Sequence, residues 1–306
     1  MNKTYDVITA LDTCMDLIVF CGEAAPRFGQ TEQRVKGYSL DLGGSCGIFA
    51  SGCAKLGLKT AGVGVVGDDP LGAMVLDGLR KSGVDVSNVS IDPKTKTVLG
   101  VTLSLDDGDR AILASPGSVN EVQTEAFTEE LLSQTRHLHI GNYYIMDQLI
   151  SGWPGLLKKA KSYGVSVSLD TNWDPDERWR GSVEELYQYT DIFLPNENEL
   201  MSLFGGGSIE EALAAAMDVM PIVAVKLGEK GAMAGHDGKT YYHEAYPAEL
   251  TDNVGAGDNF DAGFIYGFLN GFDIQECLKA GCLCGSASIS KPGGIIGQLY
   301  KCDIIA

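Results

Sequence analysis

Short runs of β-branched and apolar residues alternate with longer segments of helical periodicity along most of this chain. Runs of this kind are typical of parallel strands that are covered on both faces. We expect strands at residues 5–10, 60–66, 137–140, 165–169, 192–194 and 222–226. We expect helices at residues 48–56, 71–82, 125–133, 147–163, 197–204 and 210–217. This order predicts an α/β fold with a doubly wound three-layer αβα core, in which ligands bind at the carboxyl ends of the strands.

Two stretches of the sequence interrupt this alternation, because each is predicted to be a pair of strands with no helix between them. They are residues 17–20 with 35–40, and residues 98–105 with 111–114. The second pair is expected to turn as a hairpin at residues 106–109. We therefore expect one domain, residues 1–306, that carries a small β-sheet lid inserted at about residues 17–40 and 97–115. A sheet beside a ligand cleft can close over it and exclude water.

The charge of the chain restricts its partners. With 23 Lys and Arg against 41 Asp and Glu, the formal net charge is −18 at pH 7. Such a chain repels polyanions, which argues against nucleic acid and anionic membranes as partners. Acidic residues at 6, 12 and 16 interrupt every apolar run near the start, so we expect no signal peptide. The eight cysteines include no C-x-x-C pair, which fits a cytoplasmic setting.

The segment 251–258 reads Thr-Asp-Asn-Val-Gly-Ala-Gly-Asp and is followed at once by a helical pattern. Gly255, Ala256 and Gly257 would form the N-terminus of that helix, where backbone N–H groups and the helix dipole make an anion hole. Asp258 would be stabilised there as a carboxylate and could accept a proton from a hydroxyl. A base beside an anion hole is what phosphoryl transfer to an alcohol requires. A glycine-rich turn with Asp258 as a helix cap would fit the same residues.

This D-x-x-G-A-G-D-x-F segment resembles the signature of the ribokinase (phosphofructokinase B) family of sugar kinases. Further elements similar to those of the family occur in the same order along nearly the whole chain. They are Gly43-Gly44 with residues 64–72, the N-E-x-E element at 196–199, and the K-x-G-x-x-G element at 226–231. The resemblance implies a ribokinase-like fold. It also implies an ATP-dependent, Mg²⁺-requiring kinase that phosphorylates a hydroxymethyl group of a small sugar-like acceptor.

The resemblance also implies a role for each matching residue around the phosphates. Asp258 is implied as the catalytic base, and the three small residues before it as the anion hole for the developing charge. Glu199 is implied at Mg²⁺, acting through water, which suits an ion that usually keeps several waters. The residues implied at the nucleotide are Asn196, Lys226, Gly228 and Gly231.

On the acceptor side, Asp16 lies where the family has an aspartate that binds sugar hydroxyls. A carboxylate can accept hydrogen bonds from two neighbouring hydroxyls at once. Asp12 is the alternative, because it too follows the first predicted strand. Gly43 and Gly44 are implied to bring the backbone up to the sugar.

Two further groups complete the predicted site. Asp252 and the loop 288–294 resemble the segments that hold a monovalent cation such as K⁺ in some members of the family. Tyr143, next to Tyr144, could line an apolar pocket on which an acceptor stacks.

The chain departs from the family pattern on the acceptor side. Ile48 stands where an Asn usually follows the double glycine, Asn253 replaces a usual Thr, and the segment 170–174 lacks the Arg of a D-x-N-x-R element. An acceptor with a carboxylate or phosphate would need a positive partner. The candidates are few, namely Arg27, Arg34 and Arg110. We therefore expect a neutral polyhydroxy acceptor, either a sugar or a nucleoside.

Several alternatives stay open at this stage. The chain could be a nucleoside or vitamin-like heterocycle kinase of the same fold, or a non-catalytic sugar-binding regulatory protein. A homodimer through the lid would cover otherwise open strand edges. Gly62, Gly64 and Gly67 match a dinucleotide-binding pattern, but they lie among valines of a predicted strand, where glycines serve packing.

Overall fold

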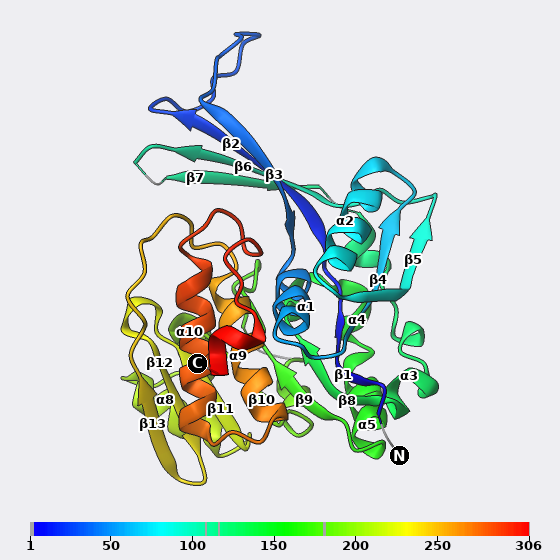
Figure 1. Ribbon diagram of the computed structural model, residues 1–306, viewed down its shortest axis with the longest axis vertical. Helices are drawn as coiled ribbons and strands as arrows, with labels where there is room; N and C mark the ends of the chain where they lie inside the picture. Colours follow the sequence, from blue (N-terminus) through cyan, green and yellow to red (C-terminus); the bar gives the residue numbers. More distant parts are fainter. Residues whose placement is uncertain (1–2, 108, 116, 180–181, 306) are drawn as a thin grey trace.

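The computed structural model describes residues 3–107, 109–115, 117–179 and 182–305. The strands of its large sheet are β1 (Tyr5–Ala10), β4 (Thr60–Gly67), β5 (Asp85–Asp92), β8 (Thr135–Ile140), β9 (Ser166–Leu169), β10 (Ile192–Phe193), β11 (Ile222–Lys226), β12 (Ala232–His236) and β13 (Lys239–His243). They pair in the order β13-β12-β11-β10-β9-β8-β1-β4-β5 (Figure 1). The pairs from β11 to β5 are parallel, whereas β12 and β13 are antiparallel at one edge. The predicted α/β sheet is confirmed.

Helices cover both faces of this sheet. The helices are α1 (Ser45–Lys55), α2 (Pro70–Lys81), α3 (Glu129–Ser133), α4 (Asp147–Ile150), α5 (Trp153–Ser162), α6 (Glu184–Tyr187), α7 (Glu197–Phe204), α8 (Ile209–Met217), α9 (Ala256–Leu269), α10 (Ile274–Ser288) and α11 (Lys301–Ile305). Among the described residues, none of them is both long and apolar enough to cross a bilayer.

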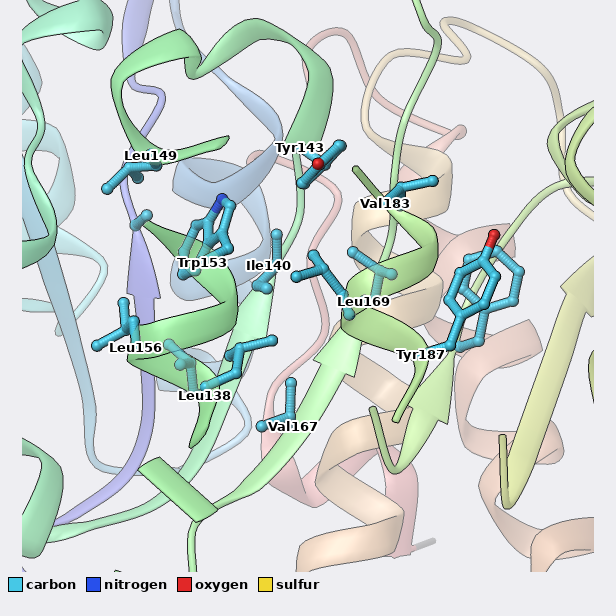
Figure 2. Packing of buried hydrophobic residues seen from close by; sticks show 14 of the residues in the cluster. Leu138, Ile140, Tyr143, Leu149, Trp153, Leu156, Val167, Leu169, Val183 and Tyr187 are labelled. Carbon is cyan, nitrogen blue, oxygen red and sulfur yellow. The ribbon is translucent and has the colours of Figure 1, made fainter. Parts of the chain in front are cut away.

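The two faces of the sheet bury separate apolar cores. On one face, Ile8 of β1 and Leu138 of β8 pack with residues of α3, α5, α6, α7 and α8. Figure 2 shows Trp153 and Leu156 of α5 pointing toward this face. On the other face, Val7 of β1 packs with residues of α1, α9 and α10. Neighbouring residues of a strand point to opposite faces, so these two cores establish the three layers.

A second, four-stranded sheet projects from the layered body, at the top of Figure 1. Its strands are β2 (Cys14–Gly22), β3 (Gly37–Gly43), β6 (Leu99–Leu105) and β7 (Arg110–Ala114), paired in the order β3-β2-β6-β7. All four strands that the sequence predicts outside the alternation are confirmed. Residue 108 of the predicted turn lies outside the described residues.

The structure corrects several predicted elements. The strands β5, β12 and β13 were not predicted, because β5 and β13 are largely polar and β12 consists mainly of small residues. The helix predicted at 147–163 is two helices, since Pro154 in the first turn of α5 suits a helix start. The helix predicted at 125–133 is a 3₁₀ turn followed by α3, which begins after the cap Thr128.

The glycines of the apparent dinucleotide pattern serve packing in β4. A Cβ at position 62 would lie 2.3 Å from Leu11 Cδ1, and one at position 64 would lie 3.0 Å from Leu11 Cβ. Leu11 fills the space over these glycines. The packing interpretation of this pattern is confirmed.

Candidate active site

The N-terminus of α9 carries the glycine-rich segment and the predicted base. Gly255 has a φ of 72°, a left-handed conformation that glycine adopts with little strain. No side chain of the described residues caps this helix end. Asp258 lies in the first turn of α9, next to the backbone N–H groups that have no partner inside the helix. The predicted pairing of a base with a helix N-terminus is present.

The residue after Asp258 ties this helix end to a neighbouring loop. The buried Asn259 amide donates to the carbonyl oxygens of Gly255 and Gly294, both at 2.8 Å. Ile48 of α1 packs on the same two glycines, because a Cβ at position 294 would lie 2.6 Å from Ile48 Cδ1. Ile48, at the position where the family pattern has an Asn, therefore makes an apolar contact with the predicted anion hole.

The Asp258 carboxyl is poorly solvated and lies among other acids. Burial raises the pKa of Asp258 well above its ordinary value, and the charge of Asp170 raises it further. Lys226 and a hydrogen bond from the Ser45 hydroxyl oppose this shift of the pKa. Burial thus opposes the stabilisation that the helix end was expected to give the Asp258 carboxylate, and its role as the base stays a prediction. A base with a raised pKa is the stronger proton acceptor once it is ionised.

Asp12 connects β1 to the N-terminus of α1. Its Oδ2 accepts from the Ser45 N–H at 3.0 Å and from the Asn142 amide at 2.6 Å, and its Oδ1 accepts from the Cys46 N–H at 2.9 Å. Gly44 is the N-cap of this helix, and a Cβ there would lie 2.6 Å from the Asp12 carbonyl oxygen. Asp12 is therefore a buried cap whose oxygens already have partners. Binding of the acceptor by Asp12 stays a prediction.

Asp16 lies on β2 of the four-stranded sheet, in a space that two glycines leave open. A Cβ at Gly43 would lie within 2.1 Å of Asp16 Oδ2, and a Cβ at Gly100 would lie within 2.4 Å of Oδ1. Burial raises the pKa of Asp16, and the facing Asp41 raises it further. In the structure Gly43 makes room for a carboxylate. The implied contact of Gly43 and Gly44 with a sugar stays a prediction.

Lys226 at the end of β11 is held by two buried carboxyls. Its Nζ lies 2.7 Å from Asp170 Oδ2 and 3.3 Å from both oxygens of Asp261. The ammonium also lies directly beneath the anion hole, because a Cβ at Gly257 would be 3.5 Å from Nζ. Lys226 thus supports the helix end from the sheet. Its implied contact with the nucleotide stays a prediction.

Asn196 and Glu199 form a capping box at the start of α7. The Glu199 N–H donates to Asn196 Oδ1 at 2.9 Å, and Glu199 Oε2 accepts from the Asn196 N–H at 2.8 Å. The Asn196 amide also donates to Glu199 Oε1 at 2.6 Å. Burial raises the pKa of Glu199 to about 7, and Asp170 adds to the shift against Lys226. A carboxyl with this pKa ionises readily when a cation arrives.

The two glycines predicted at the nucleotide lie in the turn after β11. Gly228 has a φ of 59° and opens a 3₁₀ turn, Gly228–Lys230. Gly231 has a φ of 100°, and a Cβ there would lie 2.1 Å from the His243 carbonyl oxygen. Packing against the end of β13 therefore requires Gly231. A role for either glycine at the nucleotide stays a prediction.

Asp252 lies beside the loop that was predicted to hold a cation with it. Its Oδ2 accepts from the Gly293 N–H at 3.0 Å, and its Oδ1 accepts from the Val254 N–H at 3.0 Å. The Thr251 and Asp252 N–H groups donate to the Ile289 carbonyl at 2.8 and 3.2 Å. The structure thus brings the two predicted segments together.

Tyr143 does not line a pocket for the acceptor. Its side chain is 1% exposed and belongs to the same apolar core as Ile140 and Val183, where Figure 2 shows it. Its hydroxyl pairs with Ser182. The prediction of a stacking surface at Tyr143 is wrong, because the short 3₁₀ turn after β8 directs the ring inward.

Sequence reasoning missed several residues of this site. Asp261 and Asn259 follow the signature directly, and Ser45 follows the double glycine. The side chain of each contacts a residue of the predicted site. The sequence does not show these contacts, because only the fold brings the residues together. Asn172 donates to Ser45 Oγ at 2.6 Å and has a φ of 56°. A polar residue next to a ligand-binding glycine is the one signal in the sequence that could have indicated these roles.

The charged groups around Asp258 are mostly acidic. Asp12, Asp170, Asp261 and Glu199 lie close enough to influence one another or Asp258, with Lys226 as the counter-charge. Within the described ranges, no cluster of three or more His, Cys, Asp or Glu could hold a metal ion. Mg²⁺ is commonly bound through one or two carboxylates, several waters and substrate phosphates. A single buried carboxylate such as Glu199 is therefore compatible with Mg²⁺ that arrives with a nucleotide.

The layered sheet, the projecting second sheet and the α9 site define a kinase of the ribokinase-like fold. Residues 7–300 match the model of the pfkB family carbohydrate kinases, and the chain belongs to this family. An "uncharacterized sugar kinase" of Archaeoglobus fulgidus is 30% identical over 252 residues, which are 82% of this chain and 100% of the relative. An ATP-dependent ribose-1-phosphate kinase of Halopiger xanaduensis is 30% identical over 86% of this chain and 85% of the relative.

Other relatives and solved structures agree with this assignment. A 5-dehydro-2-deoxygluconokinase of Bacillus subtilis is 27% identical over 95% of this chain and 91% of the relative. The Arabidopsis thaliana ribokinase in complex with ribose and ATP has a TM-score of 0.86 and 25% identity, and covers 100% of this chain and 98% of its own. The predicted family, fold class and enzyme class, a carbohydrate kinase, are confirmed. The family therefore favours a kinase over a non-catalytic regulatory protein.

Proposed function

We propose that this protein transfers the γ-phosphoryl group of ATP to a hydroxymethyl group of a neutral sugar-like acceptor. The observation that carries the proposal is the position of Asp258. It lies at the uncapped N-terminus of α9, with its carboxyl poorly solvated and with Lys226 beneath the adjoining Gly257 backbone. A base and an anion hole at one helix end suit the two halves of the reaction, proton removal and charge stabilisation.

In the proposed reaction the ionised Asp258 carboxylate accepts the proton of the acceptor hydroxyl. The hydroxyl oxygen forms a bond to the γ-phosphorus as the bond from that phosphorus to the β–γ bridging oxygen breaks, and ADP leaves. The backbone N–H groups of Gly255, Ala256 and Gly257 would stabilise the charge on the transferred group. Bound Mg²⁺ would neutralise charge on the phosphates, and Glu199 would hold the ion through water.

The proposed acceptor is neutral because the acceptor side is acidic. Asp16 and Asp41 face one another across β2 and β3, and Asp12 lies at the start of α1. The three candidate partners for an anionic acceptor, Arg27, Arg34 and Arg110, are all exposed. Carboxylates accept hydrogen bonds from sugar hydroxyls, whereas they repel an acceptor that carries a carboxylate or phosphate.

We also propose that the four-stranded sheet closes over the acceptor as a lid and carries a homodimer interface. Tyr38 of β3 and Ile112 and Leu113 of β7 are large apolar side chains left exposed. Such residues on a sheet edge favour association with a second copy.

A monovalent cation such as K⁺ would bind between Asp252 and the loop after α10. The closeness of Asp252 to Gly293 supports this part of the proposal. We place the activity in the cytoplasm, where ATP is available and where free thiols such as Cys14 and Cys302 persist.

The proposal is tested by coupled release of ADP across a panel of acceptors, with Mg²⁺ and with Na⁺ or K⁺. The panel contains pentoses, hexoses and nucleosides, and as anionic acceptors ribose 1-phosphate and 5-dehydro-2-deoxygluconate. We expect turnover of a neutral sugar, whereas turnover confined to nucleosides or to anionic acceptors would contradict the proposed acceptor class.

Asp258→Asn tests the role of the base on the acceptor found. We expect kcat to fall by about three orders of magnitude or more, because general base catalysis and the negative charge are both lost. Acceptor binding, measured by calorimetry, should stay within about threefold of wild type. The matched control is Asp77→Asn, which removes a surface carboxylate that pairs with Lys81. Equal turnover in Asp258→Asn and wild type would overturn the mechanism.

A further inference from the structure

Beneath the helix end that carries Asp258, two carboxyls share a single cation. Asp170 follows β9, Lys226 ends β11, and Asp261 lies one turn after Asp258 on α9. The side chains of Asp170, Lys226 and Asp261 are 6%, 12% and 1% exposed. Two buried negative charges against one positive charge would leave an uncompensated charge in a poorly solvated place, which costs several kcal/mol. One of the two carboxyls must therefore hold a proton.

The hydrogen bonds indicate which of the two is neutral. Asp170 makes the short contact with Nζ, at 2.7 Å, and its Oδ1 accepts from the Asn172 N–H at 3.0 Å. Asp261 reaches the same ammonium at 3.3 Å from each oxygen. Donors to both oxygens favour the ionised form, so the charge belongs on Asp170 and the proton on Asp261.

We propose that Asp170 and Asp261 share one proton around Lys226, carried by Asp261, and that this neutral cluster positions Asp258 against the sheet. The cluster joins the second turn of α9, which follows the turn that carries Asp258, to the ends of β9 and β11. Asp261 and Asp170 are positioning residues, because they act on the reacting groups through α9 and Lys226. The role in catalysis rests on the function proposed above, whereas the shared proton does not.

The electrostatic surroundings agree with this assignment. Burial raises the pKa of Asp261 well above its ordinary value, whereas Lys226 holds the pKa of Asp170 below its ordinary value. The other titratable groups that act on the cluster come from the elements packed against it. They are Asp258 on α9, Glu199 on α7, the neutral His139 on β8 and the buried Cys53 thiol on α1.

The shared proton is tested without substrate. The infrared difference spectrum between wild type and Asp261→Asn, recorded at pH 7, should show the loss of one protonated carboxyl band in the variant. The melting temperature of Asp261→Asn should match wild type, because an amide is neutral and of similar shape. An unchanged carboxyl band, or a melting temperature as low as that of Asp170→Asn, would overturn the proton assignment.

The positioning role is tested by the kinetics of a second substitution at the same residue. Asp261→Ala should lower kcat/KM by roughly tenfold or more, because it frees the first turn of α9, and Asp261→Asn should restore most of that loss. When kcat/KM is measured against pH, its fall on the acidic side should occur at the same pH in Asp261→Asn as in wild type.

The control is Asp191→Asn, which breaks the partly exposed pair of Asp191 with Lys161, 2.6 Å apart, at the amino-terminal end of β10 and so away from the site. Asp191→Asn should leave kcat, KM and the fall of kcat/KM at acidic pH as in wild type. Equal losses of activity in Asp261→Ala and Asp261→Asn would overturn the positioning role. Because the infrared and melting measurements use no acceptor, they decide the proton assignment even if the proposed reaction is wrong.

Discussion

At the scale of single residues, the acceptor side depends on the space that glycines leave for Asp16. Gly43 and Gly100 flank this carboxylate, and a methyl group at either position would overlap it. The sequence indicates Asp16 and Gly43 through their spacing, but it does not show that one makes room for the other. Gly100 carries no motif, because its partner is brought near only when β6 pairs with β2.

Gly43→Ala should therefore displace the Asp16 carboxylate. We expect the KM for the acceptor to rise by about tenfold or more with a smaller effect on kcat, because the change affects binding more than transfer. Initial-rate kinetics on the best acceptor check this. The control is Gly78→Ala on α2, where a Cβ would meet Leu42 at an ordinary 3.5 Å. A larger loss in kcat than in KM would show that Asp16 acts in the transfer itself.

Glu199 makes stability depend on pH in a defined direction. Its pKa in the folded chain is about 7, raised from 4.5 mainly by burial. The folded state therefore holds a proton that the unfolded state releases, and this contribution to stability is complete below the ordinary value. It is lost as the pH rises toward about 7.

Melting temperatures measured between pH 5 and 8 should therefore fall less steeply in Glu199→Gln than in wild type. Glu197→Gln, a change in the same turn of α7, is the matched control. An equal slope in Glu199→Gln and wild type would contradict the raised pKa.

At the scale of elements, α9 is held at its N-terminus by one side chain. Asn259 bonds the carbonyls on both sides of the anion hole, and these bonds are buried. Asn259→Ala should lower the free energy of unfolding by about 1–3 kcal/mol, since two carbonyls lose their donor. Chemical denaturation measures this loss.

Asn270→Ala removes a bond from the same residue type to the Tyr266 carbonyl at the exposed C-terminus of α9. Asn270→Ala should lower the free energy of unfolding by less than Asn259→Ala does, and it should leave kcat and KM unchanged. An equal fall in the free energy of unfolding in Asn259→Ala and Asn270→Ala would contradict a particular contribution of the Asn259 hydrogen bonds.

The elements that the sequence predicts best are those whose signal is local. The bounds of β1, β11 and α7 agree residue by residue with the prediction, because each has a continuous apolar run or a cap at its start. The strands β12 and β13 could not be predicted, since their pattern depends on pairing at the sheet edge. In the site, Asp258 and its glycines are adjacent in sequence and were found. Asp170, Lys226 and Asp261 meet only through the order of β9, β10 and β11.

At the scale of the whole molecule, the four-stranded sheet presents its apolar residues to solvent. If it carries the proposed dimer interface, Leu113→Glu should convert the dimer to a monomer, because a charge on each copy would meet its equivalent. Sedimentation velocity checks this result. Val219→Glu, an exposed apolar residue beyond α8, is the control and should leave the dimer intact. A wild-type monomer at micromolar concentration would contradict the interface.

The Asp12 cap has a consequence for how such an enzyme changes over evolution. The chain leaves the layered body after Asp12 and returns at Ser45, whose N–H donates to that carboxylate at 3.0 Å. The second excursion closes where the Ser118 N–H donates to the Lys96 carbonyl at 2.9 Å. Each of these two segments leaves the layered body and rejoins it at nearly the same place. Either segment can therefore lengthen, shorten or be exchanged while the layered body keeps its connections. Acceptor choice can thus diverge in a gene whose phosphoryl-transfer apparatus stays constant.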